Sequence, residues 1–246
     1  MDSGRVFLSA EWRNLVMLNY RVEPAILAPY VPRGTTVDSF SGHTYVSVVA
    51  FQFLRTKIFG AVPVPFHVNF DEVNLRFYVR REEGAEIRRG VVFVKEIVPR
   101  RAIAYIARLS YGERYFSCPM RHAVASDAHT ATAKYEWKHE GEWCSVEAAA
   151  KSAPKLPVEG SLEQFITEHY WGYSMKRGGG TLEYKVSHVP WRVWTAAEVR
   201  FQGNGDRLYG QGFGQVLSGK PDSAFIAEGS DIEVRTPRLL PAVTGL

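Results

Sequence analysis

The order of apolar and polar residues predicts a chain built mostly from β-strands. Residues 70–80 alternate between apolar and polar types, so the valine, leucine and phenylalanine side chains share one face of a strand. Residues 44–54 are β-branched and aromatic, which is typical of a strand covered on both faces. Similar patterns predict strands over residues 5–20, 91–98, 131–138, 142–149, 181–189, 191–202, 208–217 and 224–234.

Helix signals occur at only a few places. A proline suits the first turn of a short helix over residues 24–30. Residues 100–111 change to helical spacing, which predicts a second helix. Residues 161–164 form a capping box with the serine as N-cap, so we expect a third helix from there to about Tyr170.

Short turns join most of the predicted neighbouring strands. Gly84, Glu140-Gly141 and residues 203–206 carry typical turn residues. Tight turns favour antiparallel pairing, and many strands with few helices favour a closed or nearly closed barrel. The polar segment over residues 151–160 is no longer than an ordinary connection, so we expect one domain covering residues 1–246.

Composition indicates an ordinary globular protein. Of 246 residues, 46% are hydrophobic and 23% are charged, and the net charge is only +4. Arginine pairs are isolated rather than gathered in a tract, so we expect no nucleic-acid partner. No apolar run approaches the roughly 20 residues that span a bilayer, and the N-terminus has no apolar signal core. We therefore expect no membrane partner and a cytoplasmic location, where Cys118 and Cys144 remain free thiols.

The polar face of residues 70–80 presents an acid, an amide and a guanidinium in a row: Glu72, Asn74 and Arg76. An arginine holds a carboxylate with two parallel hydrogen bonds, and a glutamate whose pKa is raised by burial can act as acid or base. This strip either lines a pocket or forms the solvent-facing side of an ordinary strand.

A second candidate pocket wall follows the capping box. His169, Tyr170 and Trp171 each combine an apolar body with a polar tip, which suits a half-wet cavity. The predicted helix places Phe165 and His169 one turn apart on one face. These rings either line a ligand pocket or plug one end of the barrel.

Three phrases resemble a known family. They are residues 38–51, residues 72–79, and residues 90–93 followed by 107–108 and 111–115. Together they are similar to the YqjF-like family of uncharacterised bacterial proteins in the acetoacetate decarboxylase-like superfamily. The resemblance covers roughly residues 10–235, and Glu-Val-Asn-x-Arg-x-Tyr-Val is its most specific phrase. It implies an α+β, predominantly antiparallel β domain: a cone-shaped barrel with a few short helices and a buried pocket. It implies no known activity.

The resemblance also bears on the chemistry. In acetoacetate decarboxylases, a glycine-aromatic-proline-lysine-lysine phrase supplies a lysine that forms a Schiff base. The matching phrase here is residues 112–116, and Tyr115 stands at the nucleophile's position. Tyrosine cannot form an imine with a keto acid. Tyr115 could instead donate a proton while Arg108 anchors an anion; the alternatives are a core tyrosine and an arginine at a helix end.

Lys95 is the other candidate nucleophile. Strand alternation puts it on one face with Val91, Phe93 and Ile97, and apolar neighbours can lower the pKa of a lysine. The alternative is a lysine at the end of a strand that reaches solvent or pairs with an acid.

Two functions of different classes remain open. The first is an enzyme acting on a small carboxylate or carbonyl compound by acid–base chemistry. Its catalytic residues would be Glu72 and Tyr115, and its substrate-binding residues Asn74, Arg76, Arg108, His169, Tyr170 and Trp171. The second is a non-catalytic protein that binds a small molecule in an aromatic pocket. The seven histidines show no metal-ligand spacing and no nucleotide loop occurs, so we expect neither metal nor cofactor. The sequence leaves a homo-oligomer open.

Overall fold

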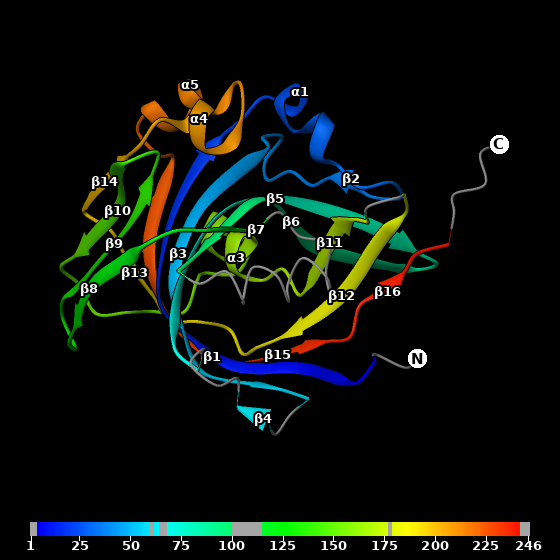
Figure 1. Ribbon diagram of the computed structural model, residues 1–246, viewed down its shortest axis with the longest axis horizontal. Coiled ribbons are helices and arrows are strands. Elements are labelled where there is room, and N and C mark those ends of the chain that lie inside the picture. Colours follow the sequence, from blue (N-terminus) through cyan, green and yellow to red (C-terminus); the bar gives the residue numbers. More distant parts are fainter. Residues whose placement is uncertain (1–3, 60–61, 64–67, 100–114, 177–178, 242–246) are drawn as a thin grey trace.

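The computed structural model describes residues 4–59, 62–63, 68–99, 115–176 and 179–241 (Figure 1). Strands predominate in these segments. They are β1 (Val6–Arg21), β2 (Thr36–Val37), β3 (Tyr45–Ile58), β4 (Val62–Pro63), β5 (Phe70–Glu83), β6 (Glu86–Val98), β7 (Tyr115–Ser117), β8 (Met120–Ser126), β9 (Ala131–His139), β10 (Glu142–Ala150), β11 (Trp171–Met175), β12 (Thr181–Ser187), β13 (Val193–Thr195), β14 (Glu198–Gln202), β15 (Ser223–Arg235) and β16 (Arg238–Leu239). The helices are α1 (Pro24–Leu27) with the 3₁₀ turn Ala28–Tyr30, α3 (Leu162–Thr167), α4 (Gly205–Tyr209) and α5 (Phe213–Ser218).

The larger sheet returns on itself. Its strand order is β13-β15-β1-β3-β5-β6-β11-β12-β16, and β12 also pairs with β15 at Val186 and Ser187. Seven strands, from β15 through β1 to β12, therefore form a continuous hydrogen-bonded ring. Most pairs are antiparallel, as tight turns favour, whereas β11 and β7 each pair with β6 in parallel.

The ring strands are covered on both faces. One face carries a core that includes Met17, Phe51 and Tyr78 and also takes in the α3 side chains Phe165 and Ile166. The other face packs against the second sheet, β14-β10-β9-β8, and against α4 and α5 (Figure 1). This double coverage explains why β3 reads as a nearly continuous apolar run.

Most predicted strands, the helix at residue 24 and the β9–β10 hairpin are confirmed. The helix beginning after Ser161 is shorter than expected. Ser161 Oγ accepts a hydrogen bond from the Gln164 amide, but α3 ends at Thr167. Trp171 pairs with Gly90 of β6, and that pairing requires an extended backbone where a continued helix would run.

Two strand predictions in the second half are wrong. Residues 191–202 divide into β13 and β14, which belong to different sheets because the chain crosses between them at Ala196 and Ala197. Residues 208–217 form α4 and α5 rather than a strand. The expected turn at residues 203–206 contains an N-cap, since Asn204 Oδ1 accepts from the Arg207 amide. The helix predicted over residues 100–111 lies outside the described residues.

Candidate functional site

A cavity of about 140 Å³ lies within the ring. One water needs only about a tenth of that space. Side chains from β1, β3, β5, β6 and β12 contribute most of the described wall, together with α3 and β7. Its polar and aromatic lining residues include Trp12, Phe51, Phe53, Phe70, Glu72, Asn74, Arg76, Glu96, Tyr115, His169, Trp171, His188 and Trp191.

The strip of acid, amide and guanidinium faces this cavity. Glu72, Asn74 and Arg76 are 3%, 1% and 8% exposed, so the solvent-facing alternative is wrong. Alternation along β5 places the three side chains on the cavity face, while Val73, Leu75 and Phe77 point to the opposite core. Asn74 Nδ2 donates to Glu72 Oε1 at 2.9 Å and orients the carboxylate.

Burial raises the pKa of Glu72 to about 7. Three neighbours oppose this effect by favouring the ionised form: the Asn74 amide, the Arg76 charge and a hydrogen bond with the Tyr115 side chain. Near neutral pH the Glu72 carboxyl is therefore divided between its acid and base forms. A carboxyl poised in this way can both take and return a proton.

The Arg76 guanidinium is hydrogen-bonded at one terminal nitrogen, whereas its Nε has no partner among the described residues. One terminal nitrogen donates to the Ile166 carbonyl at 3.3 Å and lies 3.9 Å from the Met17 sulfur. Its Nε, and Oδ1 of Asn74, are buried without a hydrogen-bond partner among the described residues. A buried donor and a buried acceptor left unpaired are costly, so the pair marks a place where a ligand gains hydrogen bonds.

A second carboxylate lines the cavity where the sequence predicted a lysine. The register of β5 with β6 shifts by one residue: Leu75 pairs with Lys95, whereas Arg76 pairs with Phe93. Val94 is the extra residue of this β-bulge. The bulge changes which β6 residues face inward, so Glu96 shares the cavity face with Phe93. Glu96 is 2% exposed and pairs with Asn74 on one side and Tyr115 on the other.

The prediction that Lys95 shares a face with Val91 and Phe93 is wrong for the same reason. Lys95 pairs with Leu75 on the face opposite the cavity, and its Nζ lies 5.9 Å from the centre of the Phe116 ring. Burial lowers its pKa, and Glu140 partly opposes that shift. A lone acid within the apolar run of residues 91–98 was the signal that could have identified Glu96.

The three candidate residues after α3 have different surroundings. His169 lines the cavity, packs between the rings of Tyr78 and Phe165, and has Nε2 3.7 Å from Asp38 Oδ2. Burial lowers its pKa against the opposing effect of Asp38, which favours neutral imidazole. Tyr170 does not line the cavity; its ring packs on His188 with centroids 4.9 Å apart.

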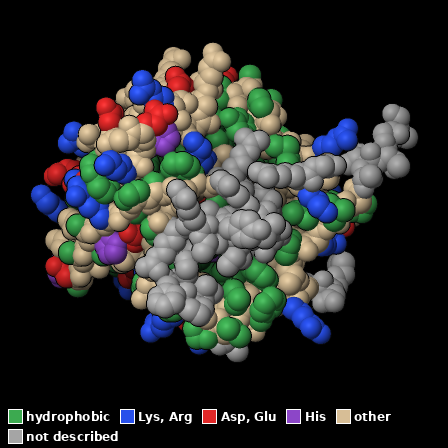
Figure 2. All heavy atoms as spheres, in the orientation of Figure 1, with side chains coloured by type: hydrophobic (Ala, Val, Ile, Leu, Met, Phe, Trp, Pro, Cys, Tyr) green, Lys and Arg blue, Asp and Glu red, His purple; other side chains and the backbone are tan. Residues whose placement is uncertain are grey.

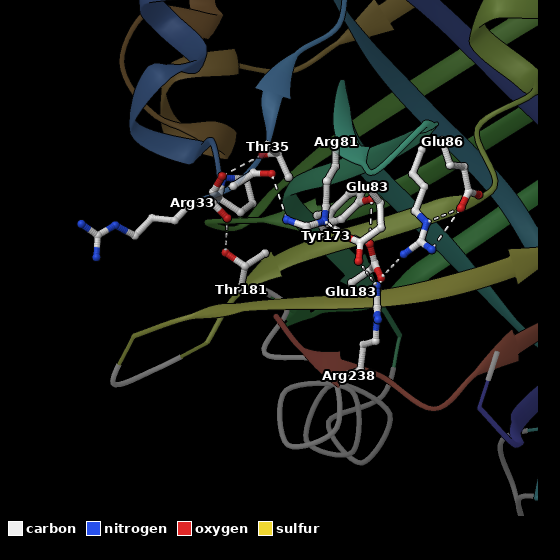
Figure 3. A network of polar contacts seen from close by, with 12 residues as sticks. Arg33, Thr35, Arg81, Glu83, Glu86, Tyr173, Thr181, Glu183 and Arg238 are labelled. Carbon is white, nitrogen blue, oxygen red and sulfur yellow. Dashed lines mark hydrogen bonds and ion pairs between the residues drawn. The ribbon is translucent and has the colours of Figure 1, made fainter. Parts of the chain in front are cut away.

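Trp171 contributes to the cavity wall but also contacts cations on its other side. The Arg88 guanidinium lies 4.4 Å from its ring centre and the Lys185 ammonium 5.9 Å. Arg88 donates to Glu183 at 3.0 Å, and neither residue lines the cavity. Glu183 is the centre of a polar network that includes Tyr173 and Arg238 (Figure 3). Arg108 lies outside the described residues.

An aromatic wall that adjoins the polar strip, where Phe51 pairs with Glu72, is the largest feature that sequence reasoning missed. Trp12, Phe51, Phe53 and Phe70 come from three strands that are distant in sequence, and they face the cavity together. His188 and Trp191 complete this wall; their rings stack with centroids 4.2 Å apart. Alternation along β1 and β3 shows which side chains share a strand face, but only the closed ring shows that these faces meet at one cavity.

The described part of the chain brings no three His, Cys, Asp or Glu side chains together as metal ligands. None of its helices is long and apolar enough to cross a membrane. Charged side chains of both signs are mixed over the second sheet, at the left of Figure 2, without a continuous basic surface there.

Residues 9–231 match the DUF2071 family, which is described as an uncharacterized conserved protein. The chain belongs to this family. The chain is also 25% identical over 201 residues to the uncharacterized protein YqjF of Bacillus subtilis, covering 81% of this chain and 80% of YqjF. The family expected from the three sequence phrases is confirmed.

Solved structures show the fold of this DUF2071 chain. An acetoacetate decarboxylase-like enzyme from Sphingomonas wittichii RW1 superposes with a TM-score of 0.68 at 12% identity, covering 99% of this chain and 95% of the enzyme. The enduracididine biosynthesis enzyme MppR, complexed with pyruvate, has a TM-score of 0.65 at 14% identity, covering 98% of this chain and 92% of MppR. The fold is therefore acetoacetate decarboxylase-like.

Proposed function

We propose that this protein is an acid–base catalyst for a small carboxylate or carbonyl compound bound inside the ring, which we take to be the cone-shaped barrel of its superfamily. The observation that carries the proposal is Glu72: a buried carboxyl on the cavity wall, with a pKa near 7 and a hydrogen bond to Tyr115. Such a pair can move a proton from carbon to oxygen and back.

Each polar group has a role in this proposal. Arg76 binds the substrate's carboxylate, which supplies the partner that its Nε lacks among the described residues. Glu72 takes a proton from the carbon next to the carbonyl, and the C–H electron pair forms the double bond of an enol. Tyr115 donates its proton to the carbonyl oxygen, and Asn74 orients Glu72 through the 2.9 Å hydrogen bond.

The remaining candidates have lesser parts. His169 and Trp171 shape the wall beside Arg76. Tyr170 acts only through His188, on which it packs. The role of Arg108 in binding an anion stays a prediction. MppR was solved with pyruvate, a compound with adjacent carboxylate and carbonyl groups, and this supports the substrate class proposed here.

The proposal excludes Schiff-base chemistry at the two places considered. The resemblance in sequence aligns Tyr115 with the decarboxylase lysine, and a tyrosine forms no imine. Lys95 pairs with Leu75 on the face of β6 opposite the cavity. In this proposal the enol forms by acid–base chemistry, without an imine.

Proton exchange tests the proposal directly. The protein is incubated in D₂O with 2-oxo acids ranging from pyruvate to 4-phenyl-2-oxobutanoate, and loss of the C3 proton signal is followed by NMR. We expect exchange with at least one acid, and Glu72→Gln to slow it by about a hundredfold or more. Lys95→Met is the control and leaves the rate unchanged. Exchange that is equal in Glu72→Gln, or an imine trapped by borohydride, would contradict the proposal.

The aromatic wall favours a second candidate, a non-catalytic binding protein. In that case the ligand binds, no acid exchanges its protons, and Glu72→Gln leaves its affinity within about threefold of the parent. The wall of rings supports this function without any reacting pair.

A further inference from the structure

The cavity wall has a polar side and an apolar side, which adjoin where Phe51 of β3 pairs with Glu72 of β5. The polar side comes from β5, β6 and β7 and carries Glu72, Asn74, Arg76, Glu96 and Tyr115. The apolar side comes from β1, β3, the start of β5 and the segment before β13. A ligand that satisfies only one side leaves the other in contact with water.

Rings on the apolar side pack against one another as a continuous surface. Phe53 and Phe70 stack with centroids 4.6 Å apart and planes 14° from parallel. Trp12 meets Phe51, Phe53 and Trp191 edge-on, with centroids 5.2, 5.7 and 6.2 Å apart. A three-carbon 2-oxo acid has a single methyl group to place against this wall. The wall therefore calls for a larger apolar body.

The polar side calls for an acidic head with a hydrogen-bond donor next to it. Nε of Arg76 and Oδ1 of Asn74 are both buried, without partners among the described residues, and their residues are two apart on one strand face. The two positions are roughly 7 Å apart along the strand. The ligand's carboxylate can therefore accept from Arg76 Nε, while a neighbouring donor, such as the hydroxyl of the enol, can reach Asn74 Oδ1. Of the polar groups in ligands, a carboxylate matches the arginine fork best.

We propose that the natural ligand is an aromatic carboxylic acid, with its carboxylate on Arg76 and its ring against the wall formed by Trp12, Phe51, Phe53 and Phe70. The inference deepens the proposed function, on which it rests for the substrate's carboxylate at Arg76. It adds that the group on the far side of the reacting carbon is a ring rather than a methyl.

Aromatic rings beside carboxylates also suit an organic cation, and this is the competing ligand chemistry. Arg76 opposes it, because its charge lies in the same cavity as Glu72 and Glu96. Protonation of Glu72, whose pKa is near 7, removes a negative charge that would attract a cation. These two effects favour an acid over an amine.

Four unreactive probes separate the possibilities by calorimetry: 4-phenylbutanoate, butanoate, 4-phenylbutanamide and 4-phenylbutylamine. We expect 4-phenylbutanoate to bind at least about tenfold more tightly than butanoate, because the ring buries apolar area on the wall. Arg76→Gln weakens binding of 4-phenylbutanoate by at least about tenfold and leaves the affinity for 4-phenylbutanamide within about threefold of the parent's. Binding of the amide shows that the variant's cavity is intact.

Two phenylalanine variants test the wall. Phe53→Leu removes a stacked ring, so it weakens binding of 4-phenylbutanoate several-fold more than binding of butanoate. Phe201→Leu, on β14 and next to Trp137 outside the cavity, changes neither affinity. Arg76→Lys provides a second head-group variant that keeps the charge and loses Nε, and it weakens the acid by less than Arg76→Gln does.

The result that overturns this inference is equal affinity for butanoate and 4-phenylbutanoate, or tightest binding of the amine. Either leaves the proposed acid–base function standing if Glu72→Gln still stops proton exchange. Conversely, tight binding of 4-phenylbutanoate with no exchange of any 2-oxo acid supports the ligand class and rejects catalysis. The two proposals therefore fail separately.

Discussion

At the scale of single residues, environment decides the chemistry of each polar group. Glu72 is an ordinary glutamate whose raised pKa comes from burial on the wall of an apolar cavity, against three neighbours that favour its charge. His169 shows the converse, since burial lowers the pKa of its imidazole and keeps the ring neutral. Burial therefore moves the pKa of Glu72 toward neutral pH and the pKa of His169 away from it.

The raised pKa of Glu72 predicts a pH-dependent stability. The folded protein binds this proton up to about pH 7, whereas the unfolded chain loses it near the ordinary value of 4.5. The contribution to stability is therefore complete below pH 4.5, declines as the pH rises toward 7, and is flat above it. The size of the loss is roughly 3 kcal/mol.

Chemical denaturation between pH 4 and 8 measures this effect, with Glu72→Gln as reference. We expect the free energy of unfolding of the parent, minus that of the variant, to fall across this window. A difference that stays constant would mean that Glu72 ionises normally in the fold.

At the scale of elements, strand pairing sets which side chains meet. The bulge at Val94 turns Glu96 inward and Lys95 outward, and it does so next to Arg76 on the neighbouring strand. Bulges are common beside functional sites because they re-aim side chains without ending a strand. The pairing of β1 with β15 is equally specific, since it requires a glycine opposite Arg13.

Gly229 is the residue that permits this close approach of β1 and β15. Its φ is +78°, and a Cβ there would lie 1.9 Å from the Trp12 carbonyl oxygen. We expect Gly229→Ala to lower the free energy of unfolding by more than about 3 kcal/mol, through backbone strain and displacement of β1.

Gly141 is the matched control for Gly229→Ala. Its φ is +89°, yet a Cβ at this turn would have no atom within 4 Å. Gly141→Ala therefore costs only the backbone strain, about 1 kcal/mol. Equal losses in urea denaturation of the two variants would show that β1 and β15 are not in close contact at this point.

At the scale of the whole molecule, closure of the ring brings distant segments together. Glu183 of β12 is fully buried and bonds to Arg88 of β6 at 3.0 Å, Arg238 of β16 at 2.6 Å and Tyr173 of β11 at 3.0 Å (Figure 3). Arg81 of β5 lies 3.8 Å from it as well, so this one carboxylate joins five strands across the part of the ring where parallel and antiparallel pairing meet.

Glu183→Gln is predicted to be strongly destabilising. The variant leaves the buried Arg88 guanidinium without its buried negative partner, which typically costs about 3–5 kcal/mol. Glu86 pairs with the same arginine, but its side chain is 50% exposed. Glu86→Gln is the control and lowers the free energy of unfolding by less than about 1 kcal/mol. Similar midpoints in urea for both variants would mean that the network contributes little to closure.

Sequence patterns predicted the fold well wherever a local rule applied. Alternation along residues 70–80 identified β5 and the face of its polar strip, and the capping serine located the start of α3. The same reasoning failed over residues 208–217. Apolar spacing there is compatible with strand and helix, and tertiary packing of Phe213 and Leu217 against the ring selects the helix.

By itself, the sequence determined the strand-rich class, the family and the acid–amide–arginine strip, because these depend on local order and on residues adjacent along one strand. Only the tertiary structure decided that Glu96 rather than Lys95 faces the cavity, since a bulge is a property of two paired strands. It also decided that rings from β1, β3 and β5 form one wall. The physical reason is that no local rule links residues whose contacts arise from closing a ring.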